Sequence, residues 1–260
     1  MGNDITLAIV IGGFYNTPVY IAMFMRQLMQ MNTCPYYLEF HSIEQVERGI
    51  IDLVRTYGGG MNNSIFLIPY SMSCVPVLHL ASKHESLSTC KIIMIDPCNL
   101  FCKKDCIPVG AMVCDSYKPF KEKGHGCILD EMHLLFEYPR LTSGLLAIAK
   151  NIPFLVSCFV RKKASQCVYR TAVKQNTLSL KKHIENNIFK ACPLTPLKHV
   201  EKTKRKLYII TGSNSEYLEH CKLLAEVNHF IQLHTLQDED HHMLYEPSRK
   251  LQAIMSKLLL

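Results

Sequence analysis

The chain has 260 residues, which suffices for one large domain or for a core with an insertion, and a core of that size needs no disulfide or metal to hold it. Apolar residues make up 48% and charged residues 20%, a composition that excludes wholesale disorder. The formal net charge of +7 is mild for this length. No base-stacking or groove-reading motif accompanies the basic residues, so we expect no nucleic-acid binding.

The start of the chain lacks the features of a secretory signal, because Met1 to Thr6 has no basic segment and carries Asp4. No segment reaches the roughly 18 uninterrupted apolar residues of a membrane-spanning helix. We therefore expect a cytoplasmic protein in which most of the 12 cysteines are reduced thiols. Gly2 together with Thr6 fits the template for N-myristoylation, so membrane contact is expected only if Gly2 is acylated.

Two kinds of apolar pattern alternate along the chain. Short continuous apolar runs predict strands at residues 7–11, 36–40, 64–69, 91–95, 207–211 and 230–236. Apolar residues at helical spacing predict helices at 17–31, 42–57, 72–84, 216–227 and 245–259. Strands that alternate with helices predict an α/β fold with a mostly parallel sheet and helices on both faces.

This alternation stops after Pro97 and resumes near residue 205. The middle also differs in charge, because residues 101–206 carry 20 basic and 8 acidic side chains, whereas the rest of the chain carries 9 and 14. We therefore expect a core made of residues 1–97 and 205–260, with residues 98–204 as a helical lid insertion. Such an insertion would cross the carboxyl end of the sheet, where ligands of open α/β sheets bind.

A serine lies between the third expected strand and the helix that follows it. Ser71 occupies the apex of this strand–turn–helix segment, which is the context of a G-x-S-x-G nucleophile elbow. The backbone amide of the next residue, Met72, would point at the developing oxyanion. Pro69 and Ser73 stand where the two elbow glycines are usual. A second interpretation therefore stays open, in which Ser71 or Ser73 only caps the helix.

Two other polar residues directly follow expected strands. His241 lies between the last strand and the last helix, where a general base is expected. An acid could follow the penultimate strand, where Ser215 stands instead, or the strand after the serine helix, where Asp96 stands. The order Ser71, Asp96, His241 is the Ser…Asp…His order of α/β hydrolases, so we expect these three residues to form a triad.

The segments around these residues resemble the thioesterase family of the α/β-hydrolase fold, particularly the thioesterase domain of animal fatty acid synthase. Residues 70–73 partly match the G-Y-S-Y-G-type turn of that family, and residues 95–97 match its acid segment. Residues 240–246 resemble its G-D-H-x-x-L-L-E-like stretch. The resemblance covers about residues 5–97 and 205–259 and is only architectural across the insertion.

The resemblance implies a serine hydrolase of lipid metabolism that cleaves fatty acyl thioesters of acyl carrier protein or coenzyme A through an acyl-enzyme. The amide of Met72, together with that of Gly13 or Phe14, would bind the oxyanion. The basic insertion is consistent with an acidic carrier protein as partner. No cofactor is expected, and no metal either, because Cys98, Cys102 and the cysteines after them lack the spacing of usual zinc sites.

Two alternatives to a thioesterase remain open at this point. A carboxylesterase or lipase that acts on oxygen esters would use the same triad. A non-catalytic relative that binds a lipid or a protein partner is suggested by Pro69 and Ser73 in the elbow.

Overall fold

A computed structural model gives the fold of the chain. The residues that the structure describes all belong to one compact unit, and they are residues 6–13, 21–40, 43–58, 64–97, 205–215, 217–226 and 228–259. The expected lid insertion, Gly2 and Phe14 lie outside the described residues.

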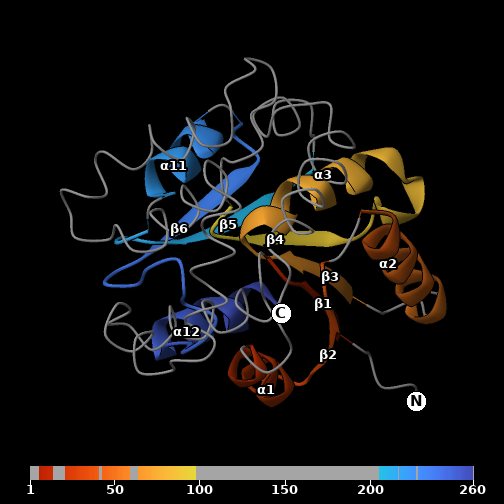
Figure 1. Ribbon diagram of the computed structural model, residues 1–260, viewed down its shortest axis with the longest axis horizontal. Coiled ribbons are helices and arrows are strands. Elements are labelled where there is room, and N and C mark those ends of the chain that lie inside the picture. The colour runs from red at the N-terminus through yellow and green to blue at the C-terminus, as the bar shows by residue number, and fades with distance from the viewer. Residues whose placement is uncertain are drawn as a thin grey trace, which may run out of the picture. The chain divides into compact units, whose positions relative to one another are not determined.

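The described strands form one six-stranded sheet in which every pair of neighbours is parallel (Figure 1). The strands are β1 (Thr6–Ile11), β2 (Thr33–Leu38), β3 (Ser64–Pro69), β4 (Lys91–Ile95), β5 (Leu207–Gly212) and β6 (Ile231–Leu236). Their order across the sheet is β2-β1-β3-β4-β5-β6. The direction of winding therefore reverses at β1 and β3, which is the place where ligands of open parallel sheets bind.

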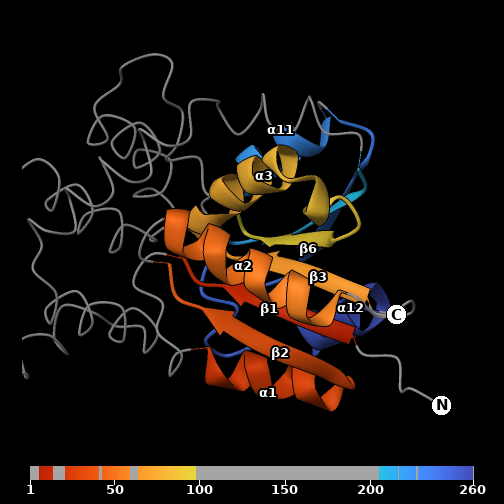
Figure 2. The ribbon, with the colours of Figure 1, turned by 90° about the vertical axis from the view of Figure 1, so that its right-hand side faces the viewer.

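Helices cover both faces of this sheet. The described helices are α1 (Ala22–Gln30), α2 (Ile43–Tyr57), α3 (Cys74–Lys83), α11 (Leu218–Glu226) and α12 (Arg249–Leu258), with short 3-10 turns η1 (Ser71–Ser73) and η2 (Glu85–Leu87). Figures 1 and 2 show α1 and α12 on one face and α2, α3 and α11 on the other. Right-handed crossovers place α1 opposite α2, α3 and α11, because α1 leads outward to β2 whereas the other three lead in the opposite direction. The predicted α/β class is confirmed.

The core of the sheet explains why its strands are recognisable in the sequence. Residues 7–11 in β1 and 92–95 in β4 are fully buried, since helices cover both of their sides. Parallel strands of this kind are nearly continuous apolar runs. The two edge strands, β2 and β6, are half-buried and more polar. β2 also contains Pro35, which an edge strand tolerates because one side of it needs no donor.

Several predicted boundaries are wrong, and two of these errors have a clear physical reason. β2 begins at Thr33 rather than at residue 36, because its pairing with β1 starts there although its exposed side chains give no apolar pattern. The last helix begins at Arg249 rather than at residue 245. Pro247 explains the second error, because a proline disfavours a helical conformation at the residue before it. The Ser248 hydroxyl then accepts a hydrogen bond from the Leu251 amide and caps the new helix.

Two further properties concern the described residues alone. None of the helices in these ranges is long and apolar enough to span a membrane. The four cysteines in the described part, Cys34, Cys74, Cys90 and Cys221, are thiols and are not joined in disulfides.

Candidate active site

The chain turns sharply between β3 and α3, with Ser71 at the first position of the 3-10 turn η1. Ser71 has a φ angle of 55°, in the left-handed region that is uncommon for residues other than glycine. It is buried, with 5% of its surface exposed. The helix predicted from residue 72 thus begins as this tight turn and becomes α-helical only at Cys74. A strained serine between a strand and a helix is the geometry of a nucleophile elbow.

Ser73, in place of the second elbow glycine, is part of the structure of the turn. It is fully buried, and its hydroxyl accepts a hydrogen bond from the Tyr70 amide at 3.0 Å. The hydroxyl hydrogen is shared between the carbonyl oxygens of Ile11 and Tyr70, each 3.0 Å away. It makes no side-chain capping bond to α3. Ser73 therefore ties the elbow to the end of β1, and it stands at the N-cap position of α3 without the side-chain hydrogen bond of a helix cap.

Pro69, in place of the first glycine, interrupts the pairing of β3 with β4. The paired register covers Phe66 and Leu67, and pairing then resumes only as an isolated bridge between Tyr70 and Ile95. A proline has no N–H to donate to the neighbouring strand, which accounts for the gap. The Cys74 thiol lies 3.4 Å from the Pro69 carbonyl oxygen. Pro69 thus loosens the end of the strand, and the elbow forms directly after it.

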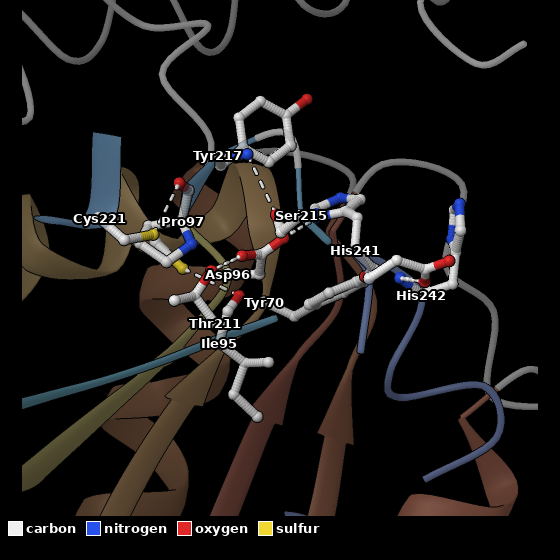
Figure 3. A network of polar contacts seen from close by, with 12 residues as sticks. Tyr70, Ile95, Asp96, Pro97, Thr211, Ser215, Tyr217, Cys221, His241 and His242 are labelled. Atoms are coloured by element: carbon white, nitrogen blue, oxygen red, sulfur yellow. Dashed lines mark hydrogen bonds and ion pairs between the residues drawn. The ribbon is translucent and has the colours of Figure 1, made fainter. Parts of the chain in front are cut away.

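Asp96 follows β4 directly and is completely buried, with a left-handed φ of 45°. Figure 3 shows its carboxylate surrounded by three donors. His241 Nδ1 and the Ser215 hydroxyl each lie 2.5 Å from Oδ2, and the Thr211 hydroxyl lies 2.5 Å from Oδ1. A buried carboxylate is costly unless it is paired in this way, so the three donors are what allow an acid at this position.

His241 lies on the loop after β6 and is 9% exposed. The Tyr70 ring stacks on the imidazole with the centroids 5.1 Å apart, and the Tyr217 ring meets it edge-on at 4.9 Å. The Tyr70 hydroxyl also donates a hydrogen bond to the His241 carbonyl oxygen. Because an ionised carboxylate only accepts, Nδ1 carries the hydrogen toward Asp96 and Nε2 is left as the basic nitrogen.

The loop that carries the histidine is docked against the turn after β5. The Asn214 amide donates to the Glu239 carbonyl oxygen at 2.9 Å, and the Asp238 amide donates to the Ser213 hydroxyl at 2.9 Å. A Cβ atom on Gly212 would lie 2.2 Å from that same Glu239 oxygen. Only a glycine at this position lets the two segments approach so closely.

The structure joins two of the three predicted triad residues directly. A buried hydrogen bond joins Asp96 and His241, whereas no hydrogen bond in the described part of the chain joins the Ser71 hydroxyl to His241. Tyr70 connects them, since it immediately precedes Ser71 and packs on the imidazole. The three residues follow β3, β4 and β6, so all lie at the carboxyl edge of one parallel sheet. Catalytic hydrogen bonds are often loose in ligand-free enzymes and tighten when the substrate binds.

Two of the predicted oxyanion donors, Met72 and Gly13, lie at the same edge. Met72 is the second residue of η1, and the first amides of a helical turn have no acceptor within it. Gly13 lies two residues after Ile11, which pairs with Pro69, and Ser71 lies two residues after Pro69. Gly13 is therefore placed beside the elbow, at the end of the neighbouring strand. The other predicted donor, Phe14, is not among the described residues.

Sequence reasoning misses four residues that hold the acid and the base. In the sequence, Ser215 is noted only because an acid could have stood there. A polar residue directly after a central strand is nevertheless a sign of a site residue. Thr211, Tyr70 and Tyr217 have no distinguishing pattern, because their roles depend on which strands lie side by side. Among the described residues, no group of three or more His, Cys, Asp or Glu side chains could hold a metal ion.

His220, on α11, is a further histidine near this network, and its imidazole is largely buried. Burial lowers the pKa of this imidazole to about 4, an effect that the nearby Asp96 carboxylate partly opposes. Its Nε2 atom is buried and has no hydrogen-bond partner among the described residues. His220 is therefore neutral at pH 7 and becomes costly to keep buried as the pH falls.

We expect His220 to make the fold acid-sensitive. Its pKa in the folded protein, about 4, lies below the ordinary value of 6.5, so the unfolded state takes up the proton first and stability falls between these two pH values. Between pH 7 and pH 5 this loss should be about 2 kcal/mol. Urea unfolding of the wild type and of His220→Gln at both pH values measures it, and the variant should lose less stability by that amount.

Exposed His229→Gln is the matched control for this measurement and should keep the wild-type dependence on pH. Equal losses of stability in the wild type and His220→Gln would contradict the prediction.

Comparison with known proteins gives a fold but no sequence family. No protein-family profile matches the sequence, and no curated protein matches it significantly. A carboxylesterase structure from Nitrososphaera gargenis is similar with a TM-score of 0.60 and 14% identity, over 99% of this chain and 90% of that one. A hydrolase from Oleispira antarctica has a TM-score of 0.64 and 12% identity, over 99% and 92% of the two chains. An α/β hydrolase from a Medee basin deep-sea metagenome has a TM-score of 0.56 and 13% identity, over 97% and 88%. The chain therefore has the α/β-hydrolase fold.

Proposed function

We propose that this protein is a serine hydrolase that cleaves acyl esters, with Ser71 as nucleophile, His241 as general base and Asp96 as the acid that orients the base. The observation that carries the proposal is the buried hydrogen bond between Asp96 Oδ2 and His241 Nδ1, 2.5 Å long, together with a strained serine at the same edge of the sheet. Several solved proteins of the same fold are described as esterases or hydrolases, which supports this class of reaction.

The proposed reaction is acyl transfer in two halves. His241 Nε2 takes the proton of the Ser71 hydroxyl as Oγ attacks the acyl carbonyl carbon. The carbonyl oxygen becomes an oxyanion, which accepts hydrogen bonds from the Met72 amide and from the amide of Gly13 or Phe14. His241 then gives its proton to the leaving oxygen or sulfur. Water, activated by the same nitrogen, releases the acid from Ser71.

The surroundings of His241 suit this role. Donation from Nδ1 to Asp96 fixes the tautomer that leaves Nε2 basic, and the carboxylate stabilises the imidazolium that forms. The rings of Tyr70 and Tyr217 hold the imidazole on two sides. The base is thus oriented before the substrate arrives, which lowers the cost of reaching the transition state.

For the substrate we propose fatty acyl thioesters, carried by acyl carrier protein or coenzyme A in the cytoplasm. This finer proposal is based on the acid that follows β4 and on the resemblance of residues 240–246 to the thioesterase family. The basic residues in 101–206 would suit an acidic carrier. Oxygen esters are the second candidate, because solved neighbours of the fold include carboxylesterases. The ratio of kcat/KM for one acyl group, presented as a p-nitrophenyl ester and as a coenzyme A thioester, distinguishes the two.

Covalent labelling tests the proposed nucleophile. A fluorophosphonate probe should label the wild type and should not label Ser71→Ala, because only an activated serine attacks the phosphorus atom. Ser82→Ala, an exposed serine on the same helix α3, is the matched control and should be labelled like the wild type. A wild type without label, or label that persists in a folded Ser71→Ala protein, would contradict the proposal and favour a non-catalytic binding protein or another nucleophile.

A further inference from the structure

The Asp96 carboxylate is held by a hydroxyl that comes from the turn after β5. Ser215 is 7% exposed, and its hydroxyl donates to Asp96 Oδ2 at 2.5 Å. The same hydroxyl accepts a hydrogen bond from the Tyr217 amide at 3.1 Å. Since that amide occupies a lone pair of Oγ, the hydroxyl hydrogen is directed toward the carboxylate. The Ser215 amide donates to the Gly212 carbonyl oxygen at 3.1 Å, so the backbone of the turn is also fixed.

The two hydroxyls that bind this carboxylate contact different oxygens. Thr211 binds Oδ1, whereas Ser215 binds Oδ2, the oxygen that accepts from His241 Nδ1. A carboxylate can turn about its last side-chain bond. Donors on both oxygens stop this rotation and leave Oδ2 facing the imidazole.

We propose that Ser215 is a positioning residue for the acid of the proposed triad. This inference rests on the proposed function. The Ser215 hydroxyl and His241 Nδ1 touch the same carboxylate oxygen, Oδ2 of Asp96, so both positions reach one point in space. An aspartate at 215 extends one bond further than the serine, which brings its oxygens toward Nδ1.

The pairing of β4 with β5 explains how Ser215, after β5, reaches the carboxylate of Asp96, after β4. β4 and β5 are neighbours in the sheet, with Ile95 paired to Ile210, so the turns that follow them lie side by side. The Asp96 amide also donates to the Ile210 carbonyl oxygen at 2.7 Å. The Asp96 carboxylate comes from the turn after β4 and its donor Ser215 from the turn after β5. Together they leave Oδ2 of Asp96 as the acceptor for His241 Nδ1.

Removing the hydroxyl is the first test. We expect Ser215→Ala to lower kcat for an acyl ester roughly 10- to 100-fold with little change in KM, because the acid is less well oriented in the transition state while substrate contacts remain. Asn214→Ala, an exposed neighbour in the same turn, is the matched control and should retain the wild-type kcat. Thermal unfolding of each variant shows whether the fold is retained.

Exchanging the two side chains is the second and sharper test. Asp96→Ser/Ser215→Asp keeps one hydroxyl and one carboxylate at the site, with the same total charge. It should recover at least about 10-fold of the kcat that Asp96→Ser loses, since the relocated carboxylate again accepts from Nδ1. Asp96→Ser/Asn214→Asp adds the same charge at a neighbouring exposed position and should recover nothing.

The two proposals fail in different ways. If wild-type Ser71 is labelled by fluorophosphonate but folded Ser215→Ala has an unchanged kcat, Ser215 is not a positioning residue. An exchange that is no better than its Asn214→Asp control would contradict the shared contact of Ser215 and His241 with one carboxylate oxygen. If the wild type has no Ser71-dependent label, the proposed function is wrong, and the assignment of Ser215 is wrong with it.

Discussion

Replacing Asp96 by asparagine should lower kcat for an acyl ester by about 10³- to 10⁴-fold while the fold is retained. The carboxamide is uncharged, so it no longer stabilises the imidazolium that forms when His241 takes the Ser71 proton. It also replaces one acceptor oxygen by an NH₂ group, and where that group faces Nδ1 the imidazole takes the tautomer whose Nε2 carries hydrogen. That nitrogen then cannot take the Ser71 proton. Asparagine tolerates the left-handed φ of 45° at this position, so the backbone should be preserved.

The control for this variant is Asp238→Asn, on the same loop as His241. Asp238 also has a left-handed φ, 67°, but its side chain is 74% exposed and contacts the exposed side chains of Lys250 and Gln237. The same chemical change there should leave kcat close to the wild-type value. Steady-state kinetics on both variants, with denaturation curves to compare folding, make the measurement. An Asp96→Asn protein with kcat within about 10-fold of the wild type would mean that the acid is another residue.

Replacing Gly212 by alanine should destabilise the protein by about 1–3 kcal/mol or more and should also reduce activity. The new Cβ would lie 2.2 Å from the Glu239 carbonyl oxygen and 2.9 Å from the Asp240 amide nitrogen. Both contacts are with backbone, which cannot turn aside as a side-chain end can. The loop must move as a whole, and His241 moves with it relative to Asp96.

Gly49→Ala on α2 is the matched control for this substitution. Its Cβ would meet only the end of the Leu38 side chain, at 3.0 Å, and that side chain can shift. Alanine in a helix interior also avoids the roughly 0.5–1 kcal/mol cost of glycine, so Gly49→Ala should be near neutral. Urea unfolding and kcat are measured for both. A Gly212→Ala variant with the stability and kcat of Gly49→Ala would show that the two turns do not depend on their close approach.

The candidate site is predictable to the extent that its residues follow buried strands. Ser71, Asp96 and His241 each come after an apolar run, and the carboxyl ends of parallel strands meet at one edge. The partners of Asp96 are not predictable in this way. In the sequence, Ser215 stands at a position where an acid could have been expected. In the structure, its hydroxyl donates a hydrogen bond to Asp96, the acid that follows the neighbouring strand.

The sequence by itself determined the α/β class, the central strands and the chain order of the candidate triad, because burial on both faces imposes continuous apolar runs such as 65–68 and 92–95. Only the tertiary structure decided how the acid is held. β4 and β5 are paired, Ile95 with Ile210, across the whole insertion between them. Pairing between such distant segments leaves no periodicity in the sequence, so the hydroxyls of Thr211 and Ser215 are brought to Asp96 by the register of the sheet alone.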